Sequence, residues 1–167
     1  MLFKNLIRLI FILVVQVLIL NNIYLGGYIN PLIYVLFIIK LPYLVRGWVL
    51  LLSAFGVGLT MDIFGNTPGL HTAALVAMAL SRPFILGLFA PRRDFNLTDE
   101  PSIKDLGIFN YVIACFLLLI VHHFMFFFLE IFRFTEFWTT VLRSLGSILF
   151  TLVLIVIAEF LFYRPKT

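Results

Sequence analysis

The sequence predicts an all-α integral membrane protein: a single bundle of six transmembrane helices with both termini in the cytoplasm. Of the 167 residues, 63% are hydrophobic and 12% are charged, and the mean hydropathy is +1.14. A water-soluble core of this length could not hide so much apolar surface, which excludes a soluble globular protein. Apolar runs recur along the whole chain, so we expect one domain over residues 1–167 with a single long polar loop at about 90–106.

The first half of the chain contains one ordinary span and one short apolar segment. Lys4 and Arg8 precede the run 9–20 as in a signal peptide, but no small-x-small cleavage site follows, so we expect an uncleaved helix. The next segment, 31–41, is short, because a full span needs about 20 residues. It therefore starts earlier, near Ile23, or is tilted, broken or locally buried.

Four longer spans follow, at about 48–64, 70–89, 107–130 and 137–162. The first two are joined by Gly65-Asn66-Thr67-Pro68-Gly69, whose residue types form turns, so they make a helical hairpin. Pro83 is expected to kink or weaken the end of the 70–89 helix. Ser102 followed by Asp105 resembles a capping box and is expected to start the next helix.

The distribution of Lys and Arg predicts the orientation. With both termini inside, ten of the twelve basic residues lie at the inner face, and two lie toward the outside. The ten are Lys4, Arg8, Lys40, Arg46, Arg82, Arg92, Arg93, Lys104, Arg164 and Lys166; the other two are Arg133 and Arg143. Basic residues scattered at the ends of apolar runs argue against a nucleic-acid partner, despite a pI of about 9.5. The lipid bilayer is the partner that they indicate.

The hairpin carries the first candidate functional residues, Asp62, His71 and Arg82. A charge at the centre of a membrane helix costs about 2.5–3.5 kcal/mol on insertion scales, so such residues usually face protein or trapped water. Ala54, Gly58 and Asp62 recur every four residues, a small-residue stripe that lets helix backbones approach closely. The simpler interpretation is that Asp62 caps a helix end, His71 is interfacial and Arg82 extends to the headgroups.

A second group of candidates is His122, His123, Glu130 and Arg143. Adjacent helical residues diverge by about 100°, so the two imidazoles cannot both face one ion, and we expect no metal site here. An interhelical hydrogen bond from one histidine is the expected role, with Glu130 interfacial. No hydrolase, zinc-protease or nucleotide-binding motif is present, so we expect neither enzyme activity nor a cofactor.

Two stripes of small residues complete the list of candidates. Ala73, Ala77 and Ser81 repeat along the predicted span 70–89, and Ser144, Ser147 and Thr151 lie along the predicted span 137–162. Such stripes usually pack helices within one chain, and a partner's transmembrane helix is the alternative.

Several of these motifs, in this order, resemble the rod shape-determining protein MreD family in its Bacteroidetes-type form. They are Asn21-Asn22, Leu41-Pro42, Gly58-Leu59-x-x-Asp62-x-Phe64, Gly69-x-His71-x-x-Ala74, Arg82-Pro83, Asp99-Glu100-Pro101-Ser102, His122-His123 and Arg143-Ser144. The resemblance covers essentially the whole chain and is most specific over residues 58–83.

The resemblance implies a non-enzymatic subunit of the bacterial inner membrane, part of the elongation machinery that maintains rod shape and lateral peptidoglycan synthesis. Its expected partners are an MreC-like single-span protein and, in the wider complex, MreB, RodA and a transpeptidase. The family is also similar in fold to the substrate-capture subunits of energy-coupling factor importers. A small ligand held near Asp62 and His71 is therefore the alternative function.

Overall fold

The computed structural model describes residues 2–22, 29–89, 99–131 and 137–161 and is helical, with five helices long and apolar enough to cross a membrane. These are α1 (Leu2–Leu18), α3 (Gly47–Gly65), α4 (Leu70–Phe89), α6 (Ile108–Ile131) and α7 (Phe137–Leu161). A 3₁₀ turn, η1 (Leu20–Asn22), and two short helices, α2 (Val35–Ile39) and α5 (Ile103–Leu106), connect them. At about 1.5 Å per residue, the 19 residues of α3 extend close to the 30 Å of a hydrocarbon core. The chain is a multi-pass membrane protein.

The second predicted span differs from an ordinary transmembrane helix. Residues 29–34 lie outside any α-helix, and α2 has only five residues, all of them buried. We call residues 29–42 the central segment. Near its start, the Asn30 N–H is hydrogen-bonded to Ser147 of α7, and near its end the carbonyls of residues 39–42 accept from Arg82 of α4. The central segment therefore passes lengthwise between α4 and α7. Of the alternatives that the sequence left open, the described residues show a broken and locally buried segment, and the start near Ile23 lies outside them.

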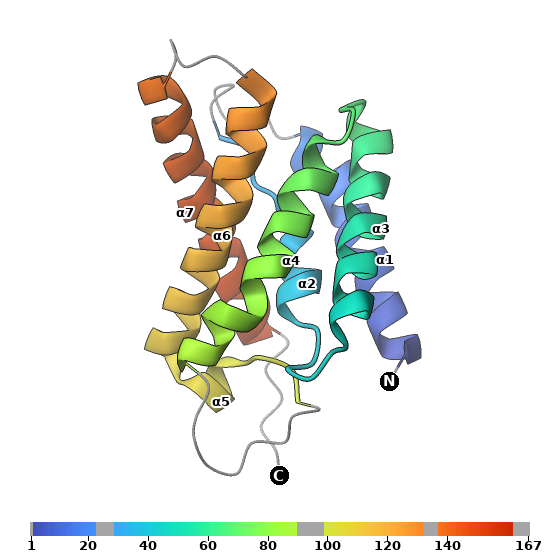
Figure 1. Ribbon diagram of the computed structural model, residues 1–167, viewed down its shortest axis with the longest axis vertical. Helices are drawn as coiled ribbons and strands as arrows, with labels where there is room; N and C mark the ends of the chain where they lie inside the picture. The colour runs from blue at the N-terminus through green and yellow to red at the C-terminus, as the bar shows by residue number, and fades with distance from the viewer. Residues whose placement is uncertain (1, 23–28, 90–98, 132–136, 162–167) are drawn as a thin grey trace.

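The long helices surround the central segment (Figure 1). α1 and α3 run in the same direction, because the central segment lies between them in the chain, and α3, α4, α6 and α7 then alternate in direction. α1 begins and α7 ends at the lower end of the figure, which we call the terminal end; α3 ends and α4 begins at the opposite end, which we call the hairpin end. α2 lies behind α4 in this view, enclosed by the bundle. Asp62 is near the end of α3 and so lies at the hairpin end, whereas Arg82 is in the second half of α4 and lies toward the terminal end.

Helix boundaries follow the predicted ones closely except at two places. The first helix starts at Leu2, well before the apolar run, and includes the polar residues Asn5 and Arg8. Ser102 does cap a helix, accepting from the Asp105 backbone N–H, but that helix has four residues. Gly107, with φ of 76°, separates it from α6, because this left-handed conformation interrupts helical hydrogen bonding. The polar loop from 90 to 98 lies outside the described residues.

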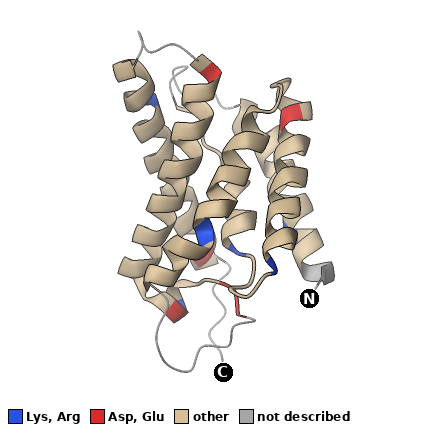
Figure 2. Cartoon of the chain, viewed as in Figure 1, with Lys and Arg blue, Asp and Glu red and all other residues tan. Residues whose placement is uncertain are grey.

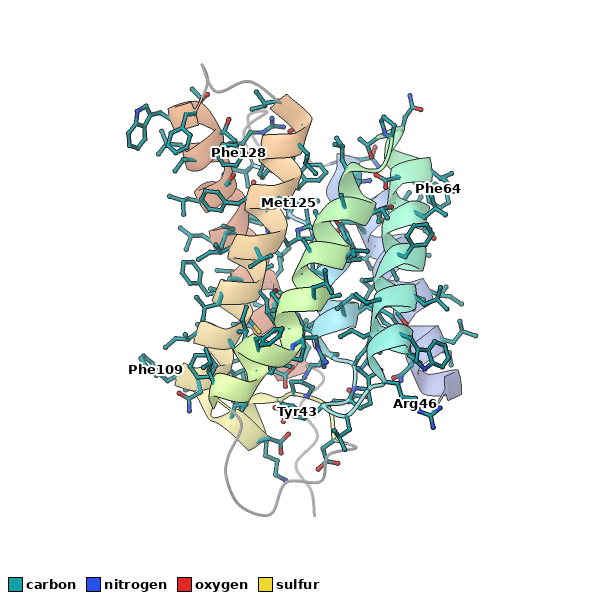
Figure 3. The ribbon with its side chains drawn as sticks, viewed as in Figure 1. Tyr43, Arg46, Phe64, Phe109, Met125 and Phe128 are labelled. Atoms are coloured by element: carbon teal, nitrogen blue, oxygen red, sulfur yellow. The ribbon has the colours of Figure 1, made fainter. Side chains whose placement is uncertain are left out.

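The outer surface of the bundle is apolar, as lipid contact requires. Phe64 on α3 and Phe109 on α6 point away from the bundle (Figure 3), and both are largely exposed. The buried core instead combines aliphatic side chains with polar ones. The fully buried polar or charged residues are Gln16, Arg82, His122, His123, Thr140, Ser144, Ser147 and Thr151, and Asp62, His71 and Glu159 are nearly so. Their partners define the candidate site.

A buried polar framework as the candidate functional site

The first part of the central segment has backbone groups that no helix satisfies, and side chains of α1 and α7 bond to them. Gln16 on α1 donates to the Pro31 carbonyl at 3.0 Å and accepts from the Ile33 N–H at 2.7 Å. From α7, the Ser147 and Thr151 hydroxyls accept from the N–H groups of Asn30 and Leu32 at 3.0 and 3.1 Å. Irregular backbone at membrane depth is tolerated only where protein or water satisfies it, so these three side chains make the segment possible.

Arg82 performs the corresponding task where the central segment ends. Its Nη2 donates to the carbonyls of Ile39, Leu41 and Pro42, the first at 3.2 Å and the last at 3.4 Å. The side chain is only 1% exposed. Arg82 therefore does not extend to the headgroups; its guanidinium is enclosed by protein and bonds to carbonyl groups at and just beyond the end of the short helix α2.

Tyr34 joins the central segment to α4 and α6. Its hydroxyl lies 2.7 Å from His71 Nδ1 and 2.9 Å from His122 Nε2, and the side chain is completely buried. His123 turns the other way, with Nδ1 3.0 Å from the Leu119 carbonyl and Nε2 3.3 Å from the Thr151 hydroxyl. The two adjacent histidines thus bond to different elements, the divergence that their helical spacing predicts.

The α3–α4 hairpin is held by Asp62. Its Oδ1 accepts from the Thr67 hydroxyl and the His71 N–H, and its Oδ2 accepts from the N–H and hydroxyl of Thr72, at distances from 2.6 to 3.0 Å. The carboxylate caps the first turn of α4 from the neighbouring helix, where the positive end of the helix dipole also favours it. This is the helix-capping role that the simpler interpretation assigned to Asp62.

The turn itself depends on residues that accept unusual backbone angles. Asn66 and Gly69 have φ of 52° and 83°, and Pro68 lies between them. Gly58 brings the helices together: a Cβ built on it would lie 2.5 Å from the Thr72 Cα. Ala54, one turn earlier, is fully buried, so the stripe of small residues faces α4.

A cluster of ion pairs closes the terminal end of the bundle. Lys40, at the end of α2, pairs with Glu159 of α7 and donates to the Pro101 carbonyl at 2.7 Å. Glu159 also accepts from the Tyr111 hydroxyl at 3.2 Å. Arg8 of α1 pairs with Glu100 at 2.5 Å. Two ion pairs therefore join α1, α7 and the end of α2 to one another and to the segment before α5, and the Tyr111 hydroxyl adds α6. The apolar surroundings strengthen the charged contacts.

The remaining predicted site residues lie at the surface or near the hairpin end. Arg143 pairs with Glu130 at 3.0 Å and lies over the Phe127 ring, so it joins α7 to α6. Pro83 occurs inside α4 and is exposed, and α4 continues to Phe89 despite it. In the described part of the chain, no group of three or more His, Cys, Asp or Glu side chains is placed to hold a metal ion.

Sequence reasoning missed Tyr34, the residue at the centre of this framework. It lies in a short apolar segment where an aromatic residue is unremarkable, and its partners are 37 and 88 residues away. The one available signal was the shortness of the segment itself, because a buried non-helical backbone needs polar side chains nearby.

The chain was compared with protein-family models, curated proteins and solved structures. No family model, no curated protein and no solved structure matches the chain.

Proposed function

We propose that this protein is a non-enzymatic subunit of the bacterial elongation machinery, of the kind that the MreD family supplies, and that it acts by binding partner membrane proteins. What supports this is the spatial pairing of the motifs behind the resemblance. Arg82 bonds to the carbonyls of Leu41-Pro42, and His71 and His122 share Tyr34. Motifs scattered over the chain thus converge on one framework, as expected of residues that maintain a common fold.

In this proposal the polar residues have a scaffolding role. Asp62, Arg82 and Gln16 are each bonded to backbone groups of the same chain, so they fix the geometry of the bundle. The partner then binds the outer, lipid-facing surface. Ser147 and Thr151 are already used within the chain, whereas Ala73, Ala77 and Ser81 on α4 are half-exposed and allow a single-span helix to approach.

We place the terminal end in the cytoplasm of a cell with an inner membrane. Figure 2 shows more Lys and Arg toward that end than toward the hairpin end. By the helix bounds, Arg8 is in the first half of α1, Arg46 directly precedes α3 and Lys104 is in α5, whereas Arg143 is near the start of α7. Lys40 directly follows α2, and Arg82 is in the second half of α4. This distribution follows the positive-inside rule. The central segment then completes a sixth crossing inside the bundle. The basic residues at 92, 93, 133, 164 and 166 lie outside the described residues, and reporter fusions at both termini test the assignment.

Depletion in the native host tests the function. Cells that lose this protein should become round, and an intact copy should restore the rod shape. Rod-shaped growth on depletion, together with saturable binding of a vitamin-like ligand by the purified protein, would replace the proposal with the importer-subunit alternative.

The docking surface is tested by enlarging a small residue. Ala77→Leu should reduce co-purification of an MreC-like single-span protein in mild detergent, because a bulky side chain keeps the partner helix at a distance. Gly87→Leu is the matched control, since Gly87 is on the same helix and has open space around it. Equal capture by both variants would show that the partner binds elsewhere.

A further inference from the structure

The Tyr34 hydroxyl lies between two imidazoles and has only one proton. It is 2.7 Å from His71 Nδ1 and 2.9 Å from His122 Nε2. A hydroxyl donates one hydrogen bond, so Tyr34 donates to one histidine and must accept from the other when both are neutral. The two histidine tautomers are therefore coupled through Tyr34.

The surroundings determine which way this chain of hydrogen bonds points. Among the described residues, His122 Nδ1 is buried without a hydrogen-bond partner. An orphaned buried N–H is rarer in proteins than an unsatisfied acceptor, so this nitrogen carries the lone pair. His122 Nε2 then donates to Tyr34, Tyr34 donates to His71 Nδ1, and the His71 proton is on Nε2. That nitrogen faces the hairpin turn, because a Cβ built on Gly65 would lie 3.5 Å from it.

We propose that His71, Tyr34 and His122 form a proton relay between the centre of the bundle and the hairpin end. A proton binds His122 Nδ1, the Nε2 proton of His122 passes to the Tyr34 oxygen, and the Tyr34 proton passes to His71 Nδ1. The proton on His71 Nε2 leaves at the hairpin end. One proton enters and one leaves, both histidines exchange tautomers, and the reverse sequence carries a proton inward.

The charged groups around the relay favour His71 over His122 as the site of an extra proton. Asp62, from α3, accepts from the backbone N–H of His71 at 2.9 Å, so its negative charge offsets part of the cost of burying an imidazolium there. On α6, the His123 ring is 5.2 Å from that of His122, so a charge on His122 would meet a second titratable ring. Gln16 from α1 and Thr151 from α7 are uncharged, and Arg143 is already paired with Glu130.

This electrostatic difference gives the relay a distinctive response to acid. When His71 is doubly protonated, its Nδ1–H donates to Tyr34, so Tyr34 must direct its own proton to His122 Nε2. The added proton is therefore the one that binds His122 Nδ1, while the Nε2 proton of His122 passes to Tyr34 and the Tyr34 proton passes to His71 Nδ1. Charging of His71 should therefore switch the tautomer of His122 while His122 stays neutral. The inference depends on the geometry of Tyr34 and its two histidines and does not require the function proposed above.

Nitrogen NMR of the full chain in lipid nanodiscs tests the relay, since the protein has only three histidines. With ¹⁵N-labelled imidazoles at neutral pH, His123 should carry its proton on Nδ1, and His71 and His122 on Nε2. As the pH is lowered, the charging of His71 and the tautomer switch of His122 should have the same midpoint. A wild-type titration in which His122 keeps its tautomer as His71 charges would overturn the proposal.

Removal of one hydroxyl provides the second test. In Tyr34→Phe the tautomer of His122 should no longer follow the charge of His71. Tyr111→Phe is the matched control, because it removes another buried hydroxyl, which bonds to Glu159 toward the terminal end and is not a partner of either histidine in the relay. Coupling that persists in Tyr34→Phe, or that is lost equally in Tyr111→Phe, would show that Tyr34 does not transmit the proton. If Tyr34→Phe fails to fold, the wild-type titration decides by itself.

Discussion

The α3–α4 hairpin and the central segment both bury polar groups among apolar helices, but their partners lie at very different distances along the chain. Asp62 bonds to residues 5 to 10 positions away. The central segment bonds to Gln16, Arg82, Ser147 and Thr151, at separations from 15 to 119. The hairpin can therefore form as a local unit, whereas the central segment is stable only when α1, α4 and α7 are packed around it.

The two regions also differ in what a lost contact leaves behind. At the hairpin, α3 and α4 retain their own backbone hydrogen bonds if Asp62 is weakened, because both are regular helices. In the central segment, loss of a side chain exposes irregular backbone to an apolar interior. Each unsatisfied buried group costs about 1–3 kcal/mol. Substitutions in the framework of the central segment should therefore be more damaging than those in the hairpin.

The largest effect is expected for Arg82→Leu. The buried carbonyls of Ile39 and Leu41 lose a charged donor, so the free energy of unfolding should fall by about 3 kcal/mol or more. Denaturation in mixed micelles, followed by tryptophan fluorescence, measures the loss. Arg46→Leu is the matched control, because Arg46 is exposed and should change stability by less than about 0.5 kcal/mol. Equal stability of the two variants would mean that Arg82 does not hold the segment.

Gln16→Leu should follow, with a loss of about 2 kcal/mol. The substitution keeps the size of the side chain but leaves the Pro31 carbonyl and the Ile33 N–H without their partner. Proteolysis of the nanodisc-embedded protein should become faster near residues 29–34. Asn22→Leu serves as control, since the exposed amide of Asn22 bonds to the Val17 and Leu18 carbonyls at the end of α1 and not to the central segment. A smaller loss for Gln16→Leu than for this control contradicts the expectation.

At the hairpin, Gly58→Ala should cost about 1–2 kcal/mol. The added methyl would lie 2.5 Å from the Thr72 Cα, and a backbone atom cannot move aside as a flexible side chain can. Gly56→Ala, on the same helix with open space around it, should be neutral or slightly stabilising. If both variants unfold at the same midpoint, the close approach of α3 and α4 has no energetic importance.

The smallest effect is expected for Asp62→Asn, about 1 kcal/mol. The amide keeps one acceptor oxygen for the first turn of α4 but places an NH₂ group against an N–H or hydroxyl donor. Thermal unfolding compared with Thr60→Val, whose hydroxyl bonds only to Gly56 of its own helix, isolates the cap. A loss larger than that of Arg82→Leu would reverse the difference between the two regions.

The sequence by itself determined the protein class and most of the helices. Hydropathy and turn residues predict 48–64 and 70–89, and the structure has Gly47–Gly65 and Leu70–Phe89. The predicted bounds of the last two helices, 107–130 and 137–162, differ from the observed bounds of α6 and α7 by at most one residue at each end. These features depend on neighbouring residues alone. An apolar run of sufficient length forms a helix that crosses the bilayer, and the residue types of Gly65-Asn66-Thr67-Pro68-Gly69 end a helix.

Only the tertiary structure determined the conformation and burial of residues 29–42 and the role of Tyr34. The sequence showed that this segment was too short to be an ordinary span, and it identified Asp62, His71, Arg82, His122 and His123 as unusual. It did not identify their hydrogen-bond partners, because the sequence of an apolar run does not indicate which distant side chains bond to its backbone. Gln16, Arg82, Ser147 and Thr151 reach the segment only once α1, α4 and α7 have packed around it.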